Sequence, residues 1–290
     1  MQVPSHVEYE RPATVEEALR ILASGNDEAR PLAGGHSLIP MMKLRLARPE
    51  LLVDINGLTE LSYIRADGDE LKIGALTRHA ELLESPVVYE HYPIFRDAER
   101  VIADPIVRNW GTIGGSLCQA DPSEDLSAAF AAVKATVVIR SSDGTRTVTA
   151  RALHVGPYET VVRPGELLTE IRLPVRSRTG SAYEKVERRV GDWSIVAAGA
   201  VLTLDGDTIA DAGIGLTAVG APHFCAPEAE EYLAGKPATD EYFTRAATIA
   251  ADNSSPVSDQ RGPEDYKRHL VAELTTRALR TASRRARGEA

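Results

Sequence analysis

The chain has 290 residues, with 33 Lys and Arg against 42 Asp and Glu and a formal net charge of −9. This length suits one large domain or two modest ones, and the hydrophobic fraction of 43% with 26% charged residues excludes a disordered or fibrous chain. The acidic balance argues against a dedicated nucleic-acid-binding protein. The two cysteines, Cys118 and Cys225, are too few for a disulfide framework, a four-cysteine zinc site or an iron–sulfur cluster.

The N-terminal residues lack the basic segment and apolar run of a secretory signal. No apolar run approaches the ~20 residues that a bilayer span requires. We therefore expect a soluble, cytoplasmic protein without a membrane span and with both thiols reduced.

The first part of the chain predicts short helices and strands in alternation. Thr14-Val-Glu-Glu17 is a capping box that opens a helix from Val15 to Ala23, which ends at Gly25. Asp67-Gly68-Asp69 joins two strand-like runs as a hairpin. The remaining expected elements in this part are strands at 29–33, 51–55, 61–66 and 70–76, and helices at 38–46, 80–83 and 94–103.

Further along, Pro122 is placed to open a helix that runs to about Lys134. Pro174 to Gly180 has the composition of a linker, so the pattern predicts two α+β units that meet near residue 175. Before the linker we expect strands at 136–140, 147–151 and 167–173. After it we expect strands at 182–190, 194–204 and 208–219, followed by helices at 227–233, 240–252 and 263–285.

Two segments with paired glycines are the sharpest local signals, Ala33-Gly-Gly-His-Ser37 and Thr112-Ile-Gly-Gly-Ser116. Glycine lets the backbone approach a ligand closely, and consecutive amide N–H groups in a turn form a concave anion site. A following helix N-terminus strengthens such a site, and hydroxyl groups can add donors to a phosphate oxygen. Two such turns suit a pyrophosphate held from both sides, whereas either pair alone is most often only a turn.

Other candidates are weaker. Gly213-Ile-Gly215-Leu-Thr-Ala218 satisfies the dinucleotide fingerprint, but it lies in a strand pattern with no helix after it, so we interpret its glycines as packing residues. Glu124 is best interpreted as a helix N-cap, whereas Asp125 can accept hydrogen bonds from ribose or ribityl hydroxyls. The histidines show no metal-ligand spacing, and only His36 lies beside a glycine pair.

The two tryptophans, Trp110 and Trp193, are by default core or interface residues, although an aromatic face can also cover a flavin ring. The sequence contains neither a Walker A motif nor a nucleophile elbow, and no acid–base pair stands out. We therefore predict no catalytic residue and no metal site on this chain.

Taken in order, these motifs resemble the FAD-binding medium subunits of molybdenum hydroxylases, in particular the medium chains of aerobic carbon monoxide dehydrogenases. The resemblance covers nearly the whole chain. It is carried by 33–43, 112–115, 120–122 with Asp125, 52–55, 73–77, 165–169, 183–185, 191–192, 258–263 and 266–268. Two positions depart from the family pattern, because Trp193 stands where Tyr or Phe is expected and Trp110 where an arginine or a smaller residue is frequent.

The resemblance implies an α+β fold: a two-subdomain FAD-binding fold of the p-cresol methylhydroxylase/vanillyl-alcohol oxidase type, followed by a C-terminal α+β domain with a three-stranded sheet and helices. The implied boundaries are 1–175, split near 57, and 176–290. The implied FAD-binding residues are Leu32, Ala33, Gly34, Gly35, His36, Ser37, Leu38, Ile102, Thr112, Gly114, Gly115, Ser116, Asp125, Leu168, Lys185 and Trp193.

The implied function is electron transfer in a heteromeric molybdenum hydroxylase. An iron–sulfur small subunit supplies electrons that originate at a molybdopterin large subunit, FAD passes them to an acceptor such as a quinone, and the complex is a dimer of heterotrimers. Two alternatives stay open: a stand-alone FAD-dependent oxidase, for which His36 or Tyr183 is the candidate acid–base residue, and a non-catalytic assembly module. The substrate is chosen by the large subunit.

Overall fold

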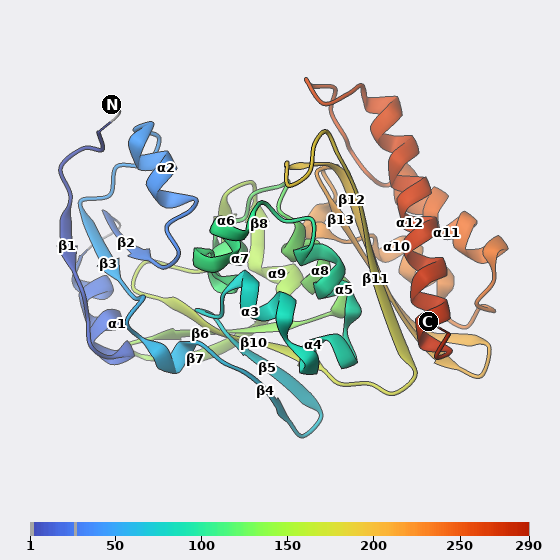
Figure 1. Ribbon diagram of the computed structural model, residues 1–290, viewed down its shortest axis with the longest axis horizontal. Helices are drawn as coiled ribbons and strands as arrows, with labels where there is room; N and C mark the ends of the chain where they lie inside the picture. Colours follow the sequence, from blue (N-terminus) through green and yellow to red (C-terminus); the bar gives the residue numbers. More distant parts are fainter. Residues whose placement is uncertain (1–2, 26–27, 290) are drawn as a thin grey trace.

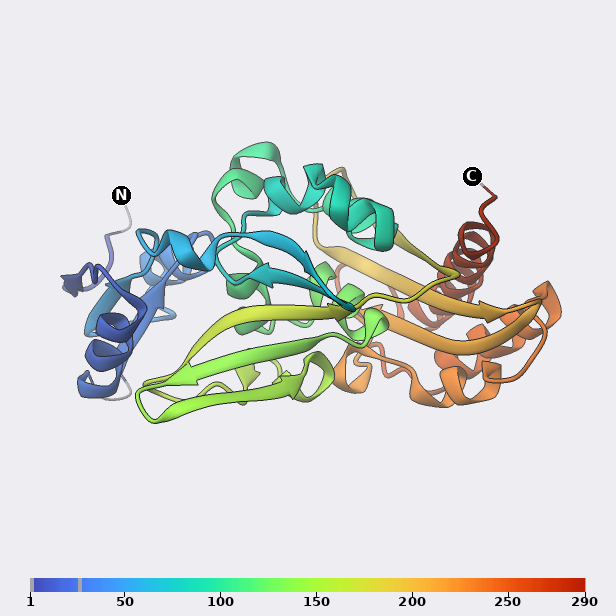
Figure 2. The same cartoon turned by 90° about the horizontal axis from the view of Figure 1, so that it is seen from below.

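The computed structural model describes residues 3–25 and 28–289, and the following account concerns those residues. Three sheets follow one another along the long axis, with the chain termini at opposite ends (Figures 1 and 2). The predicted α+β class is therefore confirmed.

The N-terminal sheet is parallel and has the order β1-β3-β2. Helix α1 packs on it because its apolar side chains recur on one face, and Thr14 caps its N-terminus by accepting a hydrogen bond from the amide of Glu17 (3.1 Å). The predicted helix and its capping residue are thus confirmed. The elements of this part are β1 (Glu8–Glu10), α1 (Val15–Ser24), β2 (Ala29–Leu32), α2 (Leu38–Lys43) and β3 (Leu51–Asp54).

The middle sheet is antiparallel with the order β4-β5-β10-β6-β7. Short helices pack against this sheet (Figure 2). They enclose one large core, in which the ring centroids of Phe95 and Phe130 lie 4.7 Å apart. The strands are β4 (Ile64–Asp67), β5 (Glu70–Gly74), β6 (Thr136–Ser141), β7 (Gly144–Thr149) and β10 (Leu167–Pro174), with a separate pair, β8 (His154–Gly156) and β9 (Glu159–Thr160). The helices are α3 (His79–Glu84), α4 (Pro86–His91), α5 (Pro93–Glu99), α6 (Pro105–Trp110), α7 (Ile113–Gln119), α8 (Asp125–Val133) and α9 (Ala150–Leu153).

The third sheet, β11-β12-β13, carries three helices on its outer side, while α5 and α8 contact its other side (Figure 1). Every predicted strand and helix of this part is present. They are β11 (Thr179–Glu187), β12 (Ser194–Asp205), β13 (Thr208–Thr217), α10 (Pro227–Leu233), α11 (Asp240–Asp252) and α12 (Glu264–Ala286).

Two glycines in β13 let helix α8 lie directly on the strand. A Cβ atom at Gly213 would overlap the carbonyl oxygen of Ala132, and one at Gly215 would overlap that of Ala128. The interpretation of this motif as a strand with packing glycines is confirmed, and these residues join the middle core to the C-terminal sheet.

Two sequence-based boundaries were wrong. Helix α8 begins at Asp125 rather than Pro122, because the Asp121 carboxylate accepts from the amide of Ser123 (2.9 Å) and the Asp121 carbonyl from that of Glu124 (3.0 Å), which forms a separate turn. Gly180 belongs to β11 rather than to a linker, since the backbone of α12 approaches it too closely for any side chain.

Several short elements were not predicted, namely β1, α4, α6, α9 and the β8–β9 pair, and neither was the turn that precedes α8. Among residues 3–25 and 28–289, no helix is long and apolar enough to cross a membrane. The cytoplasmic location stays a prediction.

We expect Gly215→Ala to lower the free energy of unfolding by about 1–3 kcal/mol, because a methyl group there must push α8 away from β13. Gly156→Ala is the matched control, since a Cβ at that strand position meets nothing closer than 3.7 Å. Urea unfolding followed by circular dichroism measures both variants, and equal midpoints would contradict the proposed packing.

Candidate functional site

The first glycine segment leaves a run of backbone donors unused. The amides of residues 34–38 donate no hydrogen bond to any described residue, and the Ser37 hydroxyl does not cap α2. Gly35 has a φ of +74°, which glycine adopts without strain. Because this stretch is partly exposed, its donors are available to an anionic ligand.

The side chain of Asn56 holds the backbone carbonyl groups just before the same segment. Its amide nitrogen donates to the carbonyl oxygen of Ala33 (2.6 Å) and to that of Leu32 (3.2 Å). The Asp54 carboxylate in turn accepts from the Asn56 side chain (2.7 Å). The end of β2 is thereby connected to Asp54 at the end of β3.

The second glycine segment differs from the predicted turn. Thr112 caps α7, so Gly114 and Gly115 lie in the first turn of a helix. The amide of Gly114 donates to the carbonyl of Ala75 (2.8 Å) and that of Gly115 to the Thr112 hydroxyl (3.2 Å). These amides are therefore already bonded within the protein, and the expectation of a second open anion turn is wrong.

The structure nevertheless brings the two segments together. A Cβ atom at Gly34 would overlap the carbonyl oxygen of Trp110 and lie 2.8 Å from the Cα of Gly111, just before Thr112. Arg78 spans the junction, since its guanidinium donates to the Trp110 carbonyl and to the Asn56 side-chain oxygen (2.9 Å). The predicted neighbourhood of the two glycine pairs is thus present.

Asp125 and Lys185 form a buried ion pair behind these segments, with Oδ2 and Nζ 2.9 Å apart and only 2% of the lysine side chain exposed. Oδ1 of Asp125 accepts from the hydroxyls of Tyr183 (2.9 Å) and Ser194 (2.7 Å). Burial raises the pKa of Asp125, and the lysine and hydroxyl donors oppose this. Asp125 thus links α8 to β11 and β12, and its contact with a ribityl or ribose hydroxyl stays a prediction.

Three apolar residues of the predicted site, Ile102, Leu168 and Trp193, belong to segments that contact Lys185, Ala103 or Ala75. Lys185 also donates to the carbonyl of Val101 (3.0 Å), next to Ile102. A Cβ at Gly191 would come within 2.5 Å of the carbonyl of Ala103, so the loop that carries Trp193 packs beside Ile102. Leu168 is buried in β10 and precedes Thr169, whose carbonyl accepts from Ala75, the partner of Gly114.

Neither tryptophan lies in the core: Trp110 is 56% exposed and Trp193 47% exposed. Of the default interpretation as core or interface residues, the core part is therefore wrong, and the interface part stays a prediction. Arg78 lies over the Trp110 ring, with its guanidinium carbon 5.8 Å from the ring centroid. Both rings are accessible to a ligand or to another protein.

Sequence reasoning missed Asn56 and Arg78, and it also missed a buried chain of His79 and Glu99 that ends at Ser116. None of these residues belongs to a local motif, because their partners lie 20 or more positions away in the sequence. Only the folded structure brings them together.

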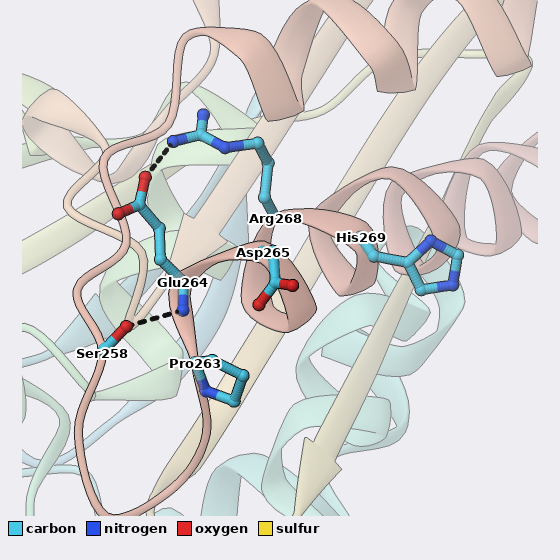
Figure 3. Close-up of a pocket in the computed structure, with 6 residues that line it drawn as sticks. All are labelled: Ser258, Pro263, Glu264, Asp265, Arg268 and His269. Atoms are coloured by element: carbon cyan, nitrogen blue, oxygen red, sulfur yellow. Dashed lines mark hydrogen bonds and ion pairs between the residues drawn. The ribbon is translucent and has the colours of Figure 1, made fainter.

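A separate hollow lies at the start of α12 (Figure 3). There the Ser258 hydroxyl accepts from the amide of Glu264 (2.9 Å), and the Glu264 carboxylate pairs with Arg268 (2.7 Å). None of the predicted cofactor-binding residues lines it, so we assign it no function. Its lining residues are Ser258, Pro263, Glu264, Asp265, Arg268 and His269.

Comparison with known families identifies the cofactor as FAD. Residues 5–176 match the family described as the FAD binding domain in molybdopterin dehydrogenase, and residues 181–282 match the CO dehydrogenase flavoprotein C-terminal domain. The unpaired amides of residues 34–38 fit this cofactor, because a diphosphate presents only hydrogen-bond acceptors.

Curated relatives match along their whole length. The carbon monoxide dehydrogenase medium chain of Afipia carboxidovorans is 40% identical over 98% of this chain and 99% of its own. The glyceraldehyde dehydrogenase medium chain of Sulfolobus acidocaldarius is 38% identical over 96% of this chain and 98% of its own. The crystal structure of the Hydrogenophaga pseudoflava carbon monoxide dehydrogenase that lacks the Mo-pyranopterin moiety contains a similar chain. It has a TM-score of 0.93 and 42% identity, and covers 97% of this chain and 98% of that one.

We expect Gly34→Val to abolish FAD retention, because its side chain must separate the amides of residues 34–38 from the 110–112 segment. Gly57→Ala is the matched control, since a Cβ there makes only ordinary contacts with Arg11, at 3.5 Å and beyond. The ratio of flavin absorbance to protein after gel filtration measures retention. Wild-type flavin content in Gly34→Val would remove this contact from the site.

We expect Asp125→Asn to lower the free energy of unfolding of the FAD-free chain by about 3–5 kcal/mol, because Lys185 is left buried without its carboxylate. Adding Lys185→Met should restore part of that loss. Asp240→Asn is the matched control: Asp240 is likewise the first residue of its helix, but its pair with Arg280 is exposed and contributes less than about 1 kcal/mol. Urea unfolding of the wild type and these three variants tests this, and equal losses at positions 125 and 240 would contradict it.

Proposed function

The chain belongs to the family of FAD-binding medium subunits of molybdenum hydroxylases, and we propose that it transfers electrons from an iron–sulfur subunit through FAD to an external acceptor such as a quinone. As an FAD-binding member of that family it is an oxidoreductase. A flavin suits the proposed transfer because it takes up electrons singly and can release them in pairs.

The observation that carries the proposal is the run of unbonded amides at residues 34–38, held against the segment that opens α7. The chain's own contribution is to bind and orient the diphosphate with these amides and the hydroxyl of Ser37. Arg78 and Asn56 hold the two segments together and would thereby keep these donors in place for the dinucleotide.

We assign the remaining predicted site residues to the part of the site between α7 and β11. We propose that Lys185, oriented by Asp125, and the neighbouring Ile102 and Trp193 border the flavin end. Leu168, next to the strand residue that bonds to Ala75, is proposed to contact the ring system from the β10 side. Which of the sixteen predicted site residues contacts which part of the cofactor stays a prediction.

The stand-alone oxidase receives less support. Tyr183 is buried, donates its hydroxyl to Asp125, and has a pKa well above its usual value because of burial and that carboxylate. A phenol held in this way is a poor proton donor or acceptor near neutral pH. His36 is exposed and has no positioning partner among the described residues.

We propose an iron–sulfur small subunit and a molybdopterin large subunit as partners, assembled as a dimer of heterotrimers. The two cysteines of this chain are too few to ligate a cluster, and no group of three His, Cys, Asp or Glu residues in the described part of the chain could hold a metal ion.

We also propose domain boundaries at 1–175, with a division near 57, and 176–290. The order of the three sheets along the chain supports these boundaries. Relatives named for carbon monoxide and for glyceraldehyde are nearly equally similar, so substrate choice is assigned to the large subunit.

We expect the chain, co-expressed with the genes beside its own, to purify with iron and molybdenum, and to bind FAD but no metal when expressed alone. In the complex, Gly34→Val should leave reduction of the iron–sulfur centres by substrate intact while abolishing reduction of a quinone acceptor. Gly57→Ala is the control. Metal analysis and visible absorbance after addition of carbon monoxide or glyceraldehyde provide the measurements. Substrate oxidation by the isolated chain, free of both metals, would reject the transfer function in favour of a stand-alone oxidase.

A further inference from the structure

Three helices meet at a chain of hydrogen bonds that ends beside the glycine segments. Glu99 of α5 accepts from or donates to Nδ1 of His79 at 2.9 Å, and Nε2 of His79, in α3, lies 2.9 Å from the hydroxyl oxygen of Ser116 in α7. The side chain of Glu99 is 0% exposed and that of His79 5% exposed. Such a buried pair of ionisable groups is costly and requires a reason.

Ser116 is the outer end of this chain. It is partly exposed and follows Gly115, which is exposed at the start of α7. A Cβ atom at Gly111 would lie 2.9 Å from Cδ2 of His79, and Gly111 is also the residue against which Gly34 packs. The hydroxyl of Ser116 therefore stands where the two glycine segments meet.

The order Glu–His–Ser is shared with nucleophilic hydrolases, but the surroundings do not support that chemistry. The amides of Gly114, Gly115 and Ser116 all donate to acceptors within the protein. The first turn of α7 therefore offers no free amide to stabilise an oxyanion at Ser116. The chain is better suited to orienting a hydroxyl than to activating it.

The proton on Nε2 of His79 decides how that hydroxyl points. When Nε2 carries a proton, it donates to the Ser116 oxygen, and the serine hydroxyl proton is free to point toward a ligand. When Nε2 is bare, it accepts the serine proton, and only oxygen lone pairs face outward. A diphosphate oxygen accepts hydrogen bonds, so it is compatible with the first arrangement and repelled by the second.

The surroundings favour the first arrangement. With one additional proton the His79–Glu99 pair is neutral, whichever of the two residues carries it, and without that proton a net negative charge is buried. Burial lowers the pKa of His79, but the Glu99 carboxylate outweighs it and leaves the pKa above its usual value; burial raises the pKa of Glu99.

Three further charged groups face the pair. Arg108 of α6, which donates to the carbonyl of Ile102 (2.7 Å), favours loss of the proton. Glu124 and Asp125 at the start of α8 favour its retention, and Asp125 is largely neutralised by Lys185. These neighbours act in opposite directions, so the charge balance within the pair itself carries the argument.

We propose that His79 and Glu99 are positioning residues that keep a proton on Nε2 and thereby turn the Ser116 hydroxyl toward a diphosphate oxygen of FAD. The inference rests on the proposed cofactor site. It makes FAD binding and protonation of the pair mutually dependent: bound FAD favours the protonated pair, so the affinity for FAD falls as the pH rises through the pKa of the pair.

The test is titration of the FAD-free, full-length chain with FAD between about pH 6 and pH 9, followed by flavin fluorescence. In the wild type the dissociation constant should rise with pH, approaching about tenfold per pH unit at the alkaline end. Ser116→Ala should weaken binding about tenfold or more at pH 6 and remove this pH dependence. Ser127→Ala is the matched control, because Ser127 also lies beside a histidine, His154 (3.4 Å), but not at the glycine segments.

Glu99→Gln separates positioning from a merely structural role. Its carboxamide is neutral and can either donate to Nδ1 of His79 or accept from it, so the variant no longer contains the carboxylate whose charge controls the pair. The variant should therefore bind FAD with an affinity that does not change with pH across this range. Circular dichroism verifies folding of each variant, and Ser116→Ala decides the question if Glu99→Gln does not fold.

Wild-type affinity and pH dependence in Ser116→Ala, or an unchanged pH slope in Glu99→Gln, would overturn the inference while leaving the cofactor site intact. Failure of the wild-type chain to bind FAD at any pH would instead overturn the proposed function itself. A uniform loss of affinity in Glu99→Gln with the wild-type slope would assign the pair a structural role only.

Discussion

The contact between Gly34 and the carbonyl of Trp110 is the constraint on which the candidate site depends. It joins the N-terminal sheet to the helices of the middle sheet at a distance that no side chain at position 34 would permit. Arg78 reinforces it with hydrogen bonds to both sides of the junction. Because this contact joins Gly34 to the residues just before α7, it determines where the amides of residues 34–38 lie relative to α7.

The two glycine pairs, although similar in sequence, serve different purposes. Residues 34–38 expose donors that water can satisfy until a ligand replaces it, so the open turn costs little in the free protein. Gly114 instead allows α7 to pack against Ala75, whose Cβ would lie 2.7 Å from a Cβ at that position. The amides of Gly114, Gly115 and Ser116 are paired within the protein, so the proposed contact of α7 with a diphosphate is left to the exposed surface of Gly115 and the hydroxyl of Ser116.

Local chemistry explains which elements were predictable. The capping box before α1, the Asp-Gly-Asp turns at 67–69 and 205–207, and the three strands and three helices of the C-terminal part depend on residues close in sequence. The start of α8 was misplaced because the Asp121 side chain competes for the amides that a helix beginning at Pro122 would need.

For the site, the motif residues were predictable, whereas the contacts that hold them were not. Arg78, Asn56, His79 and Glu99 act on partners from other elements, and a single sequence contains no signal for such pairings. Asp125 and Lys185 were each identified by resemblance, yet their ion pair becomes visible only where α8 meets β11.

Helix α8 is the element that relates the C-terminal sheet to the site. Asp125 at its start holds Lys185 and Ser194, while the carbonyls of Ala128 and Ala132 lie against Gly215 and Gly213 of β13. One helix therefore fixes two adjacent strands, and with them the 188–193 loop that carries the exposed Trp193. Because the backbones of α8 and β13 are in direct contact, a side chain at position 215 must displace one of them, and α8 also carries Asp125, the partner of Lys185. Through this helix the C-terminal sheet supports the proposed flavin end of the site.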